Sequence, residues 1–131
     1  MKISIVTFLT LFAVYIAGCS DNSTSTSNNY NSVSIRSVND TLAVSISTTN
    51  HTYNDTVQLA FSVDSVNFSI SVSGYGGGSG LFKVLHDTNT TITKDLSTNY
   101  QSTERIYTGI PTNAIIQLVN YKGNASILLT K

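Results

Sequence analysis

Cysteine, tryptophan and charged residues are scarce in this sequence. Its 131 residues include one cysteine and no tryptophan, and only 11% are charged. A lone cysteine excludes an internal disulfide, and the absence of tryptophan weakens the case for a carbohydrate-binding platform. Seven basic residues balance seven acidic ones, so no basic patch is available to neutralise phosphates. We therefore expect no nucleic-acid partner.

Small polar residues supply the polarity that charge does not. Serine, threonine and asparagine together account for 50 of the 131 positions. Serine and asparagine favour turns, and threonine suits the solvent-facing side of strands. This composition is typical of a β-rich protein outside the cytoplasm.

The first 18 residues have the layout of a secretory signal. A positive start, Met1-Lys2, precedes an apolar stretch over 3–16, and small residues follow at Ala17 and Gly18. Residues 3–18 are fewer than the roughly 20 that a transmembrane helix needs, and no basic stop follows them. We therefore predict a signal peptide over 1–18.

The end of this segment resembles the lipobox of bacterial lipoproteins. Ile16-Ala17-Gly18-Cys19 has the order aliphatic, small, small, cysteine, and the resemblance covers only the signal segment. It implies cleavage between Gly18 and Cys19 and attachment of diacylglycerol to the Cys19 sulfur. Two or three acyl chains anchor a protein far more firmly than one does. The alternative is an ordinary signal segment that carries a free thiol.

Residues 19–32 form the predicted tether between anchor and domain. After Cys19 they contain one aromatic and no aliphatic residue, too little apolar surface to offset the entropy of ordering. A flexible segment of this length spans roughly 20 Å. A serine directly after the cysteine, here Ser20, resembles the pattern of lipoproteins that are passed to the outer membrane. An aspartate at that position would suggest retention in the inner membrane, and here Asp21 occupies the next position. We expect a cell-envelope location, at the outer membrane if the host has two membranes.

Residues 33–131 form the predicted domain, and their clearest signal is strict alternation of apolar and polar residues. Segments 56–63 and 66–73 both alternate, and only Asp64 and Ser65 separate them. We predict a two-residue β-hairpin here. Its register opposes apolar residues of the two strands: Val63 with Val66, Phe61 with Phe68, Leu59 with Ile70, and Val57 with Val72. Such a hairpin buries too little to fold alone, so a second layer must cover it.

Further segments have strand character, and none has a helical period. They are 41–47, 81–86, 90–96, 105–109, 114–120 and 125–130, with a tight turn at 120–123 (NYKG) between the last two. Seven or eight short strands predict a small antiparallel β-sandwich. An immunoglobulin-like and a jelly-roll winding both remain open, since the Cys…Trp…Cys signature is missing.

The most unusual stretch of the predicted domain is glycine-rich. It consists of Gly74, Tyr75, Gly76, Gly77, Gly78, Ser79 and Gly80. A phosphate-binding loop would need a helix start after it and usually a lysine, and here an extended pattern follows. We interpret the stretch as a mobile loop between strands. The alternative is a binding loop, with Tyr75 as its contacting side chain.

No catalytic or metal-binding pattern is present. His51 and His86 are isolated, no second cysteine accompanies them, and the seven acids are scattered without a D-x-D-x-D calcium loop. Because serine is so common in this chain, the presence of a serine, a histidine and an acid does not indicate a hydrolytic triad. We expect turn histidines, no metal site, no cofactor and no enzymatic activity.

These features together predict a lipid-anchored cell-envelope protein. The membrane is its expected partner through Cys19, and the domain is a non-enzymatic structural or protein-interaction module. A glycan-binding or adhesive module that uses loop 74–80 and exposed tyrosines is the second hypothesis, and a hydrolase is the third.

Overall fold

A computed structural model describes residues 30–131, so the predicted signal segment and Cys19 lie outside the described residues. The described part is built from six strands. They are β1 (Ser32–Val38), β2 (Thr41–Gln58), β3 (Ser65–His86), β4 (Asn89–Asp95), β5 (Tyr100–Tyr107) and β6 (Asn113–Thr130). These residues contain no helix that is long and apolar enough to cross a membrane. The expected all-β, antiparallel fold is confirmed.

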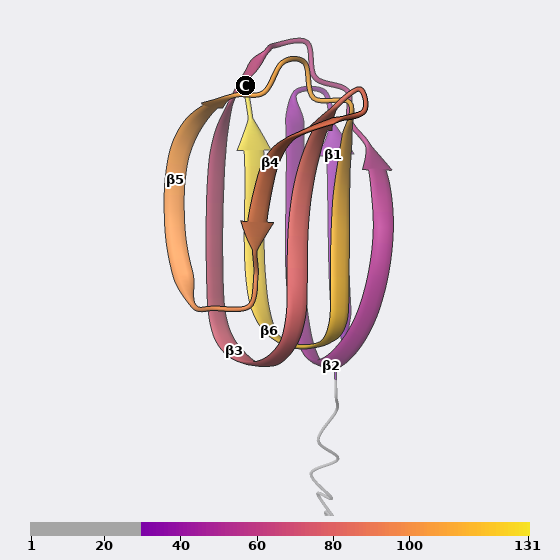
Figure 1. Ribbon diagram of the computed structural model, residues 1–131, viewed down its shortest axis with the longest axis vertical. Helices are drawn as coiled ribbons and strands as arrows, with labels where there is room; N and C mark the ends of the chain where they lie inside the picture. The colour runs from indigo at the N-terminus through magenta and orange to yellow at the C-terminus, as the bar shows by residue number, and fades with distance from the viewer. Residues whose placement is uncertain (1–29) are drawn as a thin grey trace, which may run out of the picture.

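All six strands belong to one antiparallel sheet (Figure 1). The order is β1-β2-β6-β3-β4, and β5 pairs with the first part of β3. The last strand, β6, is central, since it pairs with β2 on one side and with β3 on the other along nearly its full length. The last strand of the chain therefore lies between two strands that come much earlier in the sequence.

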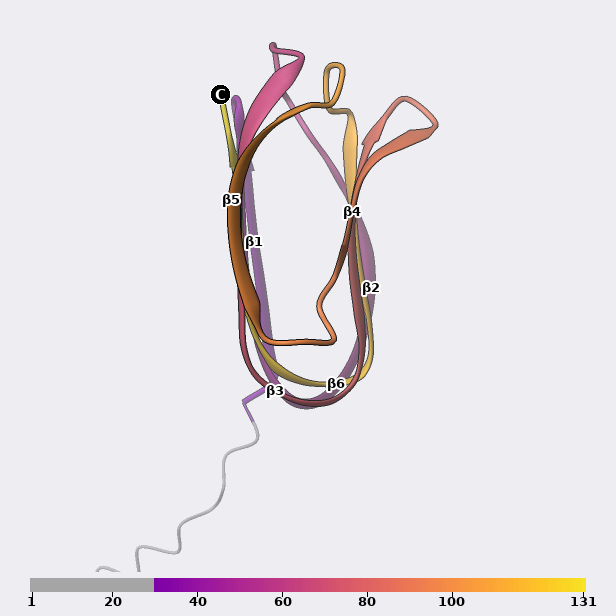
Figure 2. The ribbon, with the colours of Figure 1, turned by 60° about the vertical axis from the view of Figure 1, so that its left-hand side comes forward.

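The sheet folds over on itself because β2, β3 and β6 all bend midway (Figure 2). We call the two facing halves layer 1 and layer 2. Layer 1 comprises β1, β5 and the segments 41–48, 65–73 and 123–130 of the long strands. Layer 2 comprises β4 and the segments 53–58, 79–86 and 113–119. The apolar inner faces of the two layers meet and exclude water from each other.

Alternation along the strands supplies the core. The buried side chains of the long strands are Leu42, Val44, Ile46, Val66, Phe68, Ile70, Val72, Phe82, Val84, Ala114, Ile116, Leu118, Tyr121, Ala125, Ile127 and Leu129. Ile92 of β4 and two residues of connecting segments, Phe61 and Leu96, complete it. Phe68 of layer 1 stacks on Phe82 of layer 2, with ring centroids 6.1 Å apart. This stack joins the two layers directly.

Glycines allow β3 to approach β6 closely at the bend. The β3 ladder shifts register between Ser73 and Ser79, and Gly78 has a φ of +81°. A Cβ on Gly78 would lie 2.3 Å from the carbonyl oxygen of Asn120 in β6. Only a residue without a side chain fits between the two backbones here.

Tyr121 fills the inside of the bend. Its side chain is fully buried, and its hydroxyl donates a 2.8 Å hydrogen bond to the carbonyl of Leu96. The hydroxyl of Thr48 in β2 donates to the backbone carbonyl of Tyr121 at 2.8 Å. Burial raises the pKa of Tyr121 to about 12, with smaller contributions from neighbouring tyrosines and Asp95. Tyr121 thus connects the bend to the segment between β4 and β5.

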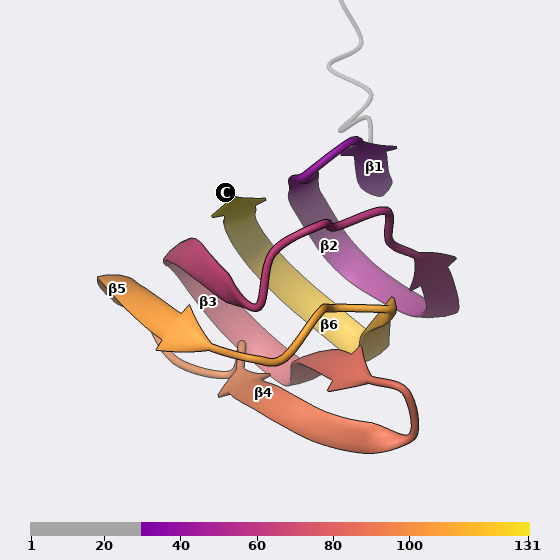
Figure 3. The ribbon, with the colours of Figure 1, turned by 90° about the horizontal axis from the view of Figure 1, so that it is seen from above.

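We call the end opposite the bend the open end. Two connecting segments cross there from one layer to the other (Figure 3). Residues 59–64 lead from β2 to β3, and residues 108–112 lead from β5 to β6. They bond to each other: the Leu59 amide donates to the Thr112 carbonyl at 2.9 Å, and the Thr108 amide to the Asp64 carbonyl at 2.8 Å. These bonds satisfy backbone groups that have no ladder partner.

The predicted hairpin of 56–63 with 66–73 is wrong. Its first strand ends at Gln58, and no pairing joins β2 to β3; Phe68 lies opposite Leu129 of β6 and Glu104 of β5 instead. The expected apolar residues do face the interior, since Phe61 is buried and Leu59 and Val63 pack against the core. Alternation identifies the buried face of a strand, but it carries no information about which strand lies beside it.

Strand boundaries also differ from the sequence prediction. Segments expected as separate strands continue through the bend as single long strands, so NYKG at 120–123 lies within β6 and is no hairpin turn. Asn120, with a φ of +49°, bends the backbone without ending the ladder. β1 was not expected from the sequence, although Val33 and Ile35 alternate with polar residues there and pack against the core.

We expect Gly78→Ala to destabilise the fold strongly because its Cβ would collide with the β6 backbone. Gly77→Ala is the matched control, since Gly77 also has a positive φ, of +141°, but has open space where a Cβ would stand. Gly77→Ala should lower the free energy of unfolding by about 1 kcal/mol, and Gly78→Ala by at least about 2 kcal/mol more. Urea denaturation measures both; equal losses would contradict the close approach.

Tyr121→Phe should lower the free energy of unfolding by about 1–2 kcal/mol at neutral pH, because it leaves the buried Leu96 carbonyl without a donor. The pKa of Tyr121 is raised from 10.0 to about 12, so the folded state holds this proton more tightly than the unfolded state. The stability from Tyr121 is therefore complete below pH 10 and is lost as pH rises towards 12.

The difference between wild type and Tyr121→Phe should shrink over that pH range in urea titrations. Tyr107→Phe is the control, since Tyr107 is 74% exposed. A difference that is constant with pH would show that the Tyr121 hydroxyl is not held in its protonated form by the fold.

Candidate binding groove

The glycine-rich stretch 74–80 is not a loop between two strands. It lies inside β3 at the bend, where Gly77 pairs with Lys122 and Ser79 with Val119 of β6. Tyr75, proposed from the sequence as a contacting side chain, is half-buried. Its ring lies 5.9 Å from the Tyr121 ring, and its hydroxyl donates to the Gly78 carbonyl at 2.7 Å. Tyr75 thus stabilises the bend. Gly18 and Cys19 lie outside the described residues.

A groove of about 550 Å³ lies beside the bend, on the outer face of layer 2. Its volume is within the range of small-molecule sites, about 300–1,000 Å³. All four strands of layer 2 or their flanks contribute to its lining, which consists of Thr52, Tyr53, Asn54, Ser79, Gly80, Leu81, Asp95, Ser97, Gln117, Leu118 and Val119. Two members of the predicted binding loop, Ser79 and Gly80, are among them.

Strand register brings the main groove residues into one row. Gln117 of β6 lies opposite Asn54 of β2 on one side and opposite Leu81 of β3 on the other, and Leu81 lies opposite Asp95 of β4. Opposed residues share a face. Gln117 is exposed and its neighbour Leu118 is buried, so the row points outward. No spacing in the sequence indicates this row, because its four members come from four strands.

The groove combines free polar groups with apolar surface. Among the described residues, no hydrogen-bond partner occupies the amides of Asn54 and Gln117 or the hydroxyl of Ser79. Hydrogen bonds from the side chain and backbone of Ser97 lower the pKa of Asp95, which keeps its carboxylate ionised. Val119, which is 52% exposed, supplies apolar surface at the bend side.

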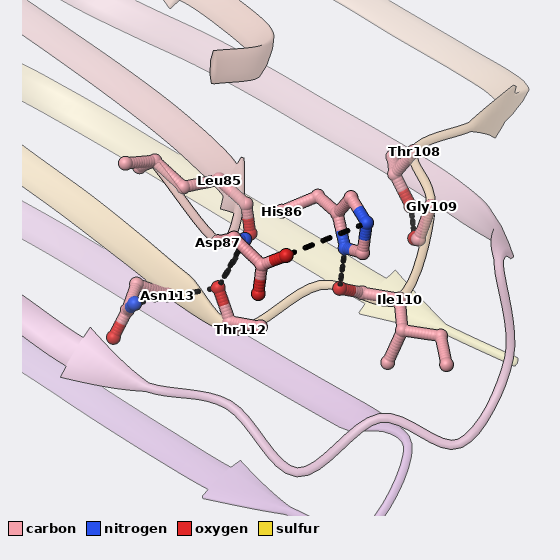
Figure 4. Close-up of polar contacts among 8 residues, drawn as sticks. All are labelled: Leu85, His86, Asp87, Thr108, Gly109, Ile110, Thr112 and Asn113. Carbon is pink, nitrogen blue, oxygen red and sulfur yellow. Dashed lines mark hydrogen bonds and ion pairs between the residues drawn. The ribbon is translucent and has the colours of Figure 1, made fainter. Parts of the chain in front are cut away.

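His86 fixes the connection 108–112 at the open end (Figure 4). Its Nδ1 lies 2.7 Å from the Ile110 carbonyl oxygen, and because a carbonyl only accepts, Nδ1 carries the hydrogen. Next to it, the Asp87 amide donates to the Thr112 hydroxyl at 2.9 Å, and that hydroxyl donates to the Leu85 carbonyl. Gly109 packs against the imidazole, where a Cβ would lie 2.8 Å from a ring carbon.

The two histidines lie at opposite ends of the described domain. His51 lies at the bend, opposite Tyr121 in the ladder, and its ring is 6.1 Å from that of Tyr53. His86 lies at the open end, where Asp87 is 3.9 Å from its Nε2. Within residues 30–131, no three histidine, cysteine or acidic side chains come together as a group that could hold a metal ion.

We expect His86→Ala to loosen the connection between β5 and β6, because Ile110 loses its donor and Gly109 its packing partner. The free energy of unfolding should fall by about 1 kcal/mol, and amide hydrogen exchange should speed up in residues 109–112. His51→Ala removes the other histidine, which has no such bond, and is the control. Faster exchange in 109–112 with His51→Ala, or unchanged exchange with His86→Ala, would contradict this role.

Comparison with known proteins identifies no relative of this chain. No family model matches it, and no curated protein or solved structure matches it at a significant level.

Proposed function

We propose that the protein is a bacterial lipoprotein anchored in the cell envelope through Cys19. The observation that carries this proposal is the segment Ile16-Ala17-Gly18-Cys19 at the end of an apolar run. Its folded sheet, which we class as a β-sandwich, acts as a non-enzymatic structural or protein-interaction module. In a host with two membranes we propose the outer membrane, because Ser20 follows the cysteine.

The position of the first described residues supports a defined orientation on such an anchor. β1 begins at Ser32, which pairs with Ser47 beside the bend, and the Asn31 side chain accepts a 2.9 Å hydrogen bond from the Thr49 amide. The domain is thus attached to the preceding chain at its bend end. A tether of roughly 20 Å would keep the bend near the membrane and direct the open end away from it.

The open end has features of a protein-contact surface. Three exposed apolar side chains lie at this end of the strands: Val38 closes β1, Tyr107 closes β5 at the opposite edge of layer 1, and Ile110 lies in the crossing connection. Exposed aromatic and aliphatic side chains are the groups that protein interfaces bury. The bonds of His86 and Thr112 hold this connection in place, which lowers the entropy lost on binding.

The placement of the histidines supports a non-enzymatic role. A hydrolytic triad needs a hydroxyl, an imidazole and an acid within hydrogen-bond reach. The Nδ1 hydrogen of His86 bonds to the Ile110 carbonyl, and His51 stacks near Tyr53 with no acid bonded to it among residues 30–131. We retain a hydrolase only as the third hypothesis.

A glycan-binding or adhesive module is the second candidate function. The groove on layer 2 favours it, because free amides and hydroxyls surround an apolar surface there. The bend residues 74–80 contribute to the groove through Ser79 and Gly80 and not through Tyr75, the contacting side chain in the alternative interpretation of the sequence.

The lipid anchor is tested by Cys19→Ala. We expect wild-type protein to incorporate labelled fatty acid and to sediment with membranes, because Cys19 would carry the acyl chains. The variant should incorporate no label and leave the membrane fraction, and globomycin should make the unprocessed wild-type precursor accumulate. Ser20→Ala is the control. It changes a residue next to the cleavage site but keeps the cysteine, so it tests whether any substitution at this place prevents processing. Unchanged labelling and fractionation of Cys19→Ala would reject the lipoprotein proposal.

A further inference from the structure

The groove on the outer face of layer 2 has no part in the lipid anchor or in the open-end surface. We propose that it binds a neutral saccharide of one or two sugar units. This inference deepens the second proposed function, the glycan-binding module, and names its site and ligand class. It does not depend on lipidation of Cys19.

The charge of the groove excludes anionic ligands. Asp95 is the only ionised side chain in its lining, which contains no lysine, arginine or histidine. Lys83 lies on the same face of β3, one row further from the bend, and does not line the groove. A phosphate or carboxylate ligand would meet a fixed negative charge without a compensating cation.

The polar groups of the row can bind the hydroxyls of a saccharide. Adjacent strands lie about 4.8 Å apart, so the row Asn54, Gln117, Leu81, Asp95 presents two amides and a carboxylate across three such spacings. Sugar hydroxyls donate and accept, as amides do, and an ionised carboxylate accepts from two neighbouring hydroxyls. Ser97 bonds to the Asp95 carboxylate through its amide, at 2.8 Å on Oδ1, and through its side chain. A carboxylate can accept about four hydrogen bonds, so Asp95 keeps acceptor capacity for a ligand.

Aliphatic side chains complete the match to a sugar. Leu81 lies between Gln117 and Asp95 in the row, and exposed Val119 lies two residues from Gln117 along β6. The C–H face of a pyranose ring can pack on these groups while its hydroxyls reach the amides. A small cation would use Asp95 alone and leave both the amides and this apolar surface without a role.

Glycan binding is measured with the full-length protein in a detergent that lacks a sugar headgroup, since an alkyl glycoside would compete. The protein is applied to an array of neutral and acidic glycans, and the best ligand is titrated by calorimetry. We expect neutral glycans among the bound ones. Gln117→Ala and Asn54→Ala should each raise the Kd at least tenfold, and Asp95→Asn should do the same.

Gln101→Ala is the matched control. Gln101 is also an exposed glutamine on an outer strand face, but it lies on β5 in layer 1, so its loss should leave the Kd unchanged. The proposal is overturned if no neutral glycan binds, if only amines or acidic glycans bind, or if Gln117→Ala and Gln101→Ala behave alike. Cys19→Ala protein loses the anchor and keeps the groove, so failure of one proposal is distinguishable from failure of the other.

Discussion

The bend shared by β2, β3 and β6 is the feature on which the whole fold depends. A single sheet with one apolar face cannot exclude water from that face unless something covers it. Here the sheet covers itself, and it can do so only because three adjacent strands turn at the same level. Gly78 allows the β3 and β6 backbones to approach, and Tyr121 fills the space inside the turn. The remaining core residues are buried as a consequence of this bend.

The bend also gives the described domain two ends with different surfaces. The preceding chain joins the domain at the bend, through Asn31 and Ser32, while the crossing connections and their exposed apolar tips lie at the other end. Such a division suits a protein tethered by its N-terminus, because attachment and contact do not compete for the same surface. The groove lies between them on the outer face of layer 2, with Val119 beside the bend.

The layers are further joined at the edge away from β1. Lys94 of β4 forms an ion pair with Glu104 of β5, and its ammonium group also lies 5.3 Å from the centre of the Phe68 ring. This pair is partly exposed, so it contributes little free energy by itself. Its position still matters, since β4 and β5 belong to different layers and do not pair with each other in the ladder.

Several features of the fold could be predicted from local patterns. Leu42, Val44 and Ile46 alternate with polar residues, and all three are buried. The same alternation cannot show that 66–73 pairs with β5 and β6, because strand partners far apart in sequence share no local signal. The glycine stretch 74–80 was interpreted as a loop for a similar reason: glycine permits both a loop and a close approach of strands, and only the position of β6 shows which of them forms.

The main row of the groove could not be predicted, since Asn54, Gln117, Leu81 and Asp95 become neighbours only through register. The sequence by itself determined the β class and the buried faces of most strands, because these depend on composition and on a two-residue period. The tertiary structure alone decided the strand partners, the bend and the groove. These depend on contacts between distant residues, which the chain forms only when its apolar faces close on each other.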